Sequence, residues 1–107
     1  MCGIFGFIAA PGAELGPDRM RNYISDLFAL SEPRGQEASG MAIALDGEIR
    51  VFKRGLAPSR MMRTRGYQEF LEANLADLAL DENARLLTPA AVMGHCRLVT
   101  NGAEIVA

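Results

Sequence analysis

The chain has 107 residues, which is enough for one small domain with a single core. Half of the residues are hydrophobic, 22% are charged and the formal net charge is −2, a profile typical of a globular protein. A pI near 5.3 with scattered basic residues argues against a nucleic-acid partner. No stretch approaches the ~20 apolar residues of a membrane span. We therefore expect a soluble cytoplasmic protein with no membrane partner.

Two elements are predicted at the start of the chain, a buried strand over 3–10 and a helix over 18–30. The strand is short and apolar, and it ends at the turn signal Pro11-Gly12. Pro33 is expected to end the helix, which leaves 34–39 as a polar loop before the next strand. The helix is predicted by apolar residues at roughly helical spacing, namely Met20, Tyr23, Ile24, Leu27, Phe28 and Leu30.

A β-hairpin is the next predicted feature. Residues 41–45 and 48–53 flank Asp46-Gly47, the strongest short hairpin signal in the sequence, and should pair antiparallel. Three further elements are predicted: a basic, irregular segment over 56–66, a second helix over 67–80 and a last strand over 90–96. We expect the irregular segment to be a mobile crossing loop. The predicted class is mixed α and β.

Cys2 and Cys96 are the only cysteines, so a disulfide framework is not expected. Removal of Met1 would give Cys2 a thiol and a free α-amine on the same residue. An unperturbed α-amine has a pKa of ~7.7 to 8.0, so at neutral pH a fraction of it can take the thiol proton. No partner histidine is then required. The alternative interpretation is a small buried cysteine at the start of a strand.

Two loops carry polar residues at the ends of predicted elements, over 33–40 and 94–102. Arg97, in the second loop, can bind a carboxylate through two parallel charge-assisted hydrogen bonds, and Thr100 can add another donor. The alternative makes Arg97 a surface ion-pair partner and Thr100 a turn residue.

Together the opening Met1–Gly6 and these two loops, Arg-Gly-Gln-Glu-Ala-Ser-Gly over 34–40 and Gly-His-Cys-Arg-Leu-Val-Thr-Asn-Gly over 94–102, resemble the class II glutamine amidotransferases. Those enzymes are N-terminal-nucleophile hydrolases that release ammonia from glutamine. The resemblance implies an α+β fold, a four-layer αββα sandwich of two antiparallel sheets between helices. The predicted strands would supply part of each sheet. The first loop is similar to amidophosphoribosyltransferases and the second to glucosamine-6-phosphate synthases.

The resemblance also implies roles for individual residues. Cys2 would attack the side-chain amide of L-glutamine, and Arg97 would pair with the substrate α-carboxylate, assisted by Thr100. Asn101 occupies a substrate-binding position where the family often carries histidine. No cofactor and no metal are implied. Supporting positions near the nucleophile are Arg34, Gly35 and Gly102.

Members of that family carry an Asn-Gly pair that forms the oxyanion hole, and then an acid that binds the substrate amine, further along than Ala107. We therefore expect residues 1–107 to be the N-terminal part of such a domain and nearly inactive alone, since one lost oxyanion donor costs roughly 100- to 1,000-fold in rate. Ammonia would go to a synthase, phosphosugar or phosphoribosyl acceptor domain outside the chain. Exposed sheet edges would favour a homo-oligomer.

Two other hypotheses remain open. The chain is alternatively an inactive interaction or regulatory module, which would need neither removal of Met1 nor Arg97. A metal or redox site of Cys2, His95 and Cys96 is the third hypothesis. Strand alternation argues against it, because His95 and Cys96 should point to opposite faces. Two thiols and one imidazole also fall short of a closed tetrahedral site.

Overall fold

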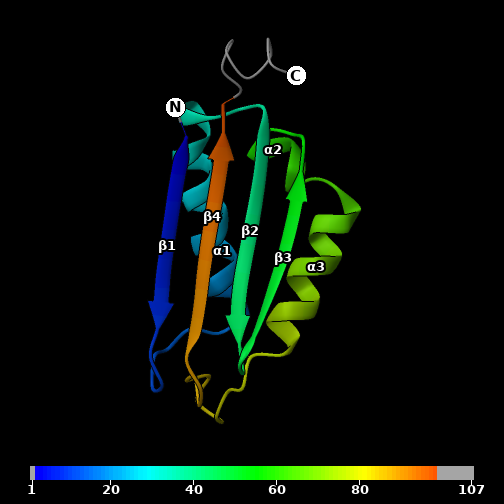
Figure 1. Cartoon of the computed structure of the whole chain (residues 1–107). Helices are drawn as coiled ribbons and strands as arrows, with labels where there is room; N and C mark the ends of the chain where they lie inside the picture. Colours follow the sequence, from blue (N-terminus) through cyan, green and yellow to red (C-terminus); the bar gives the residue numbers. More distant parts are fainter. Residues whose placement is uncertain (1, 99–107) are drawn as a thin grey trace.

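The computed structural model describes residues 2–98, which form one antiparallel sheet with helices on one of its faces (Figure 1). The sheet has four strands in the order β1-β4-β2-β3. The chain therefore has the α+β character predicted from the sequence. The elements in chain order are β1 (Gly3–Ala9), α1 (Pro17–Ser31), the 3-10 helix η1 (Glu32–Arg34), β2 (Ala38–Leu45), β3 (Glu48–Arg54), α2 (Pro58–Met61), α3 (Arg65–Ala76) and β4 (Ala90–Arg97).

The β2–β3 hairpin is confirmed. Asp46 and Gly47 have φ values of 50° and 80°, so both central turn residues are in the left-handed region that a type I′ turn requires. This turn pairs Leu45 with Glu48 and so sets the register of the whole hairpin.

β4 lies in the middle of the sheet, although it comes last in the described chain. It pairs antiparallel with β1 on one side and with β2 on the other, so that Cys96 lies between Gly3 and Ser39. The expectation that the predicted strands are divided between two sheets is wrong for residues 2–98, because all of these strands belong to one sheet.

The core lies between the helices and one face of the sheet, which we call the inner face. Phe28 of α1 meets the ring of Phe5 edge to face, with centroids 4.8 Å apart. The Phe5 ring lies over Gly94 of β4, where any side chain would overlap it. Among the apolar positions that predicted this helix, Tyr23 and Leu30 are exposed, because α1 contacts the sheet along a narrow stripe made by Met20, Ile24 and Phe28.

The segment 56–66 is more ordered than the expected mobile loop. It contains the short helix α2, whose first turn is held by the Glu32 carboxylate: Ser59 donates to it through its backbone N–H (2.7 Å) and its hydroxyl (3.1 Å). Thr64 then caps α3, its Oγ1 accepting a hydrogen bond from the Tyr67 N–H (3.2 Å).

The helix predicted over 67–80 corresponds to α3, which ends earlier than predicted. Its last residue is Ala76 and not Leu80. Leu80 instead forms an isolated β-bridge with Leu86, and this pairing turns the chain back toward β4. The apolar residues after Ala76 therefore pack as a turn against the core, which helical spacing alone cannot distinguish from one more helical turn.

The other face of the sheet, which we call the outer face, carries no helix of the described chain (Figure 1). Large apolar side chains stand exposed on it, among them Ile4 (69% exposed), Ile8 (81%), Ile49 (74%), Val51 (53%) and Met93 (54%). The residues of an antiparallel sheet that face water are normally polar. Within residues 2–98 no helix is long and apolar enough to cross a membrane.

Candidate functional site

Cys2 and Arg97 lie at the same end of the sheet. Gly3 pairs with Cys96, and one further step in this antiparallel register brings Cys2 opposite Arg97. Residues opposite each other on antiparallel strands have Cα atoms about 5 Å apart. Both residues are exposed, whereas Gly3 and Cys96 are buried, so the alternation of strand residues puts Cys2 and Arg97 on the outer face. The fold thus brings the two ends of the described chain together.

Arg97 is anchored through its backbone, and the residue is exposed. Its carbonyl accepts a hydrogen bond from the Glu37 N–H (3.0 Å), which joins β4 to the start of β2. Within residues 2–98 the structure gives the Arg97 guanidinium no hydrogen bond or ion pair. The surface ion pair that was the alternative interpretation of Arg97 is therefore not seen in this part of the chain.

The Arg34-Gly35 turn packs directly against the same end of β4. A Cβ atom at Gly35 would lie 2.5 Å from the Cys96 carbonyl oxygen and 2.7 Å from the Arg97 carbonyl carbon, so only glycine allows this approach. The Cβ of Arg34 lies 3.2 Å from the position that a Cβ of Gly3 would occupy. Two of the three predicted supporting residues, Arg34 and Gly35, are thus next to the strand ends that carry Cys2 and Arg97.

Cys96 and His95 point to opposite faces of β4. Cys96 is fully buried on the inner face, and burial, aided by the Glu32 carboxylate, raises the pKa of its thiol to about 11. His95 is half-buried and lines a groove on the outer face. Among residues 2–98 no group of three His, Cys, Asp or Glu side chains is arranged to hold a metal ion. Of the two thiols, only Cys2 is exposed.

The remaining predicted site residues, Thr100, Asn101 and Gly102, lie outside the residues that the structure describes. Their place relative to Cys2 stays a prediction.

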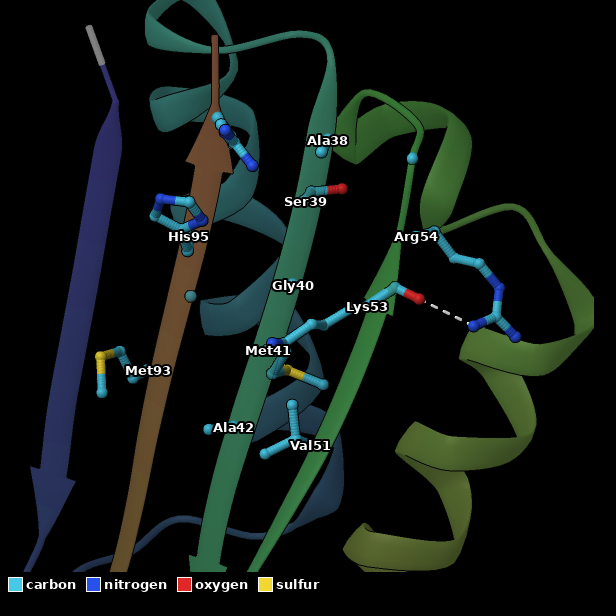
Figure 2. A pocket seen from close by; sticks show the side chains of 13 residues that line it. Ala38, Ser39, Gly40, Met41, Ala42, Val51, Lys53, Arg54, Met93 and His95 are labelled. Atoms are coloured by element: carbon cyan, nitrogen blue, oxygen red, sulfur yellow. Dashed lines mark hydrogen bonds between the residues drawn. The ribbon is translucent and has the colours of Figure 1, made fainter. Parts of the chain in front are cut away.

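An open groove of about 540 Å³ runs over β4, β2 and β3 on the outer face (Figure 2). Its wall includes Lys53, Arg54, His95 and Arg97, and no acidic side chain is among its lining residues within the described chain. Arg54 is turned toward α3: its guanidinium lies 4.1 Å from the centre of the Phe52 ring and donates to the Lys53 carbonyl (2.7 Å). The groove therefore presents Lys53, His95 and Arg97 to a ligand.

The sequence analysis did not identify Lys53 as a site residue, although its place across from Gly40 follows from the hairpin turn. A two-residue turn that pairs Leu45 with Glu48 must also pair Gly40 with Lys53. The pairing of Gly40 with His95 had no such local signal.

Comparison of the chain with known protein families, with curated proteins and with solved structures finds no match.

Proposed function

We propose that the chain is the glutaminase segment of a class II glutamine amidotransferase. Cys2, exposed as the N-terminus once Met1 is removed, attacks the side-chain amide of L-glutamine and yields glutamate and ammonia. The observation that carries this proposal is the shared position of Cys2 and Arg97 at one end of the outer face, with the Arg34-Gly35 turn packed behind them. A synthase, phosphosugar or phosphoribosyl domain outside the chain uses the ammonia, in a cytoplasm that keeps both thiols reduced.

The reaction divides into two steps at Cys2. In the first step the α-amine takes the thiol proton, the sulfur forms a bond to the amide carbon, and the C–N bond breaks as ammonia leaves with that proton. In the second step water adds to the thioester, the C–S bond breaks and glutamate is released with the thiol restored. The position of Cys2 before β1 suits this role, because its side chain is exposed while the strand that follows is fixed in the sheet.

Arg97 holds the other end of the substrate in this proposal. Its planar guanidinium binds the α-carboxylate of glutamine through two parallel hydrogen bonds, and its register opposite Cys2 suits a ligand that spans the two side chains. Thr100 and Asn101 complete the contacts to the substrate, as the resemblance implies.

The fold that we propose is the αββα sandwich, in which a second sheet packs against the outer face and leaves the end that carries Cys2 and Arg97 open to ligands. The exposed apolar side chains on that face support this proposal, since a sheet with two apolar faces needs a layer on each. The second layer would also supply the oxyanion hole, so the segment alone should turn over glutamine roughly 100- to 1,000-fold more slowly than a completed domain.

The same apolar face favours a second candidate function, an interaction or regulatory module without catalysis. A contiguous exposed apolar patch marks a binding surface in many proteins. The two candidates differ at the N-terminus, because the module needs no free Cys2 amine. A mature chain that retains Met1 would favour the module.

The intact mass of the purified chain, measured before and after treatment with a diazo-ketone analogue of glutamine, tests the proposal. We expect loss of the Met1 mass and one adduct, mapped to Cys2 by peptide analysis. The Cys2→Ser variant is the control and should gain none, while buried Cys96 is an internal control in the unchanged chain. A chain that retains Met1, or an adduct that excess glutamine does not suppress, would contradict the glutaminase assignment.

A further inference from the structure

The groove on the outer face contains a row of side chains that the glutaminase proposal does not use. His95 of β4, Gly40 of β2 and Lys53 of β3 are register partners in one line across the sheet. Figure 2 shows Lys53 extending from β3 across β2, over the strand that carries Gly40. The floor beneath this row is apolar and is made by residues such as Ala42, Val51 and Met93.

Gly40 leaves room for the Lys53 stem above β2. A Cβ atom at position 40 would come within 3.3 Å of the Lys53 Cγ, so the stem would have to shift by a few tenths of an ångström. Lysine is common on edge strands, where its charge discourages pairing with a further strand. Lys53 is on the edge strand β3 but folds back over the sheet, and its ammonium therefore belongs to the groove.

The groove gathers basic side chains, and no acidic side chain is among its lining residues in the described part of the chain. Some arginines elsewhere pair with carboxylates: Arg21 with Asp18 and Glu72, Arg50 with Glu48 and Asp77, and Arg85 with Glu14. In the groove Lys53 and Arg97 have no carboxylate partner among residues 2–98. A chain with a net charge of −2 thus leaves two cations and an imidazole together beside an apolar floor.

We propose that this groove binds the oxyanion of a small molecule, a carboxylate or a phosphate, through the Lys53 ammonium with the His95 imidazole beside it. The ammonium acts as a point charge, and the imidazole can donate an N–H. The groove volume of about 540 Å³ lies in the range of metabolite sites, roughly 300 to 1,000 Å³. The site does not depend on the reactivity of Cys2, so it goes beyond the glutaminase proposal.

Titration of the full chain with sodium glutamate and, separately, with inorganic phosphate, followed by ¹⁵N NMR, tests this site. The amides of Gly40 and Gly94 line the groove and serve as reporters. We expect saturable shifts at these amides with at least one anion. Lys53→Gln should weaken binding about tenfold, the size expected for one hydrogen bond to a charged group, and Lys53→Arg should retain most of it. Tighter glutamate binding that Lys53→Gln weakens would identify a carboxylate ligand of the groove, and tighter phosphate binding that Lys53→Gln weakens a phosphorylated one.

Arg19→Gln is the matched control, because it removes one exposed positive charge from α1, outside the groove. It should change the dissociation constant by less than twofold. Absence of saturable shifts at Gly40 with either anion, or equal weakening by Arg19→Gln, would overturn the proposal. Cys2→Ser should leave anion binding intact, so this result and the labelling of Cys2 can fail independently.

Discussion

The two faces of the sheet are built from similar residues but have different surroundings. On the inner face Ile24 and Phe28 of α1 are fully buried against the strands. On the outer face Ile8 is equally apolar and is 81% exposed. The hydrophobicity of the residues alone therefore does not indicate which face of the sheet the helices cover. What distinguishes the faces is the chemistry at the end near Cys2, where Lys53, His95 and Arg97 all belong to the outer one.

A matched pair of isoleucines should separate the two faces most strongly. Ile24→Ala removes a fully buried side chain and should lower the free energy of unfolding by about 2 to 5 kcal/mol. Ile8→Ala removes an exposed one and should change it by less than about 0.5 kcal/mol. Urea unfolding followed by circular dichroism measures both values.

Ile24→Val gives a milder test for the case that the alanine variant does not fold, with an expected loss of about 0.5 to 1.5 kcal/mol. Equal losses at positions 8 and 24 would mean that the outer face is already covered in solution, for instance by a second copy of the chain.

The next largest difference should be in the rates at which the two cysteines react with an alkylating reagent. At pH 8 a thiol with a pKa of about 11 holds a very small thiolate fraction, and Cys96 is also shielded from reagents. We expect iodoacetamide to modify Cys96 at least ~100-fold more slowly in the folded chain than in urea, where its pKa returns to ~8.5. Cys2 should be modified in both conditions. Rapid modification of Cys96 in the folded chain would contradict its burial.

Alkaline pH should lower the free energy of unfolding by a smaller amount, through ionisable groups that are buried on the inner face. Burial raises the pKa of Cys96 to about 11 and also raises that of Tyr67, whose hydroxyl finds no hydrogen-bond partner within the described residues. The unfolded chain ionises first, at ~8.5 for cysteine and ~10 for tyrosine, so it then binds fewer protons than the folded chain. Stability should thus be full below pH ~8 and decline as the pH rises toward 11.

Urea midpoints measured from pH 7.5 to 10.5 check this decline, and Cys96→Ala should make it shallower. A midpoint that stays constant or rises over this range would contradict the burial of both groups.

Local signals in the sequence predicted most elements but not their arrangement. Asp46-Gly47 is sufficient to predict the hairpin, because both residues tolerate positive φ, and the hairpin in turn sets the neighbour of Lys53. The insertion of β4 between β1 and β2 joins segments far apart in the chain, and no local pattern indicates it. The ends of α3 were misplaced, since apolar spacing continues into a turn that packs on the core.

Only part of the candidate site was predicted, because local motifs indicate some of its residues while the others depend on long-range strand pairing. Cys2, Arg34 and Arg97 were identified from motifs, and the structure brings these strand ends and the supporting turn together. The groove was missed because it needs the long-range register of Gly40 with His95, in addition to the local register of Gly40 with Lys53.

The central position of β4 determines the order in which the chain can assemble during synthesis. The β2–β3 hairpin closes across two turn residues, Asp46 and Gly47, and can form early. Within the described chain β1 has no partner strand until β4 is made, because Gly3 pairs with Cys96, which lies 93 positions later. Closing so long a loop is slow and leaves an apolar strand exposed in the meantime. The end of the sheet that carries Cys2 is thus completed after the hairpin, so a nascent chain holds the Cys2 thiol apart from Arg97 until β4 has been made.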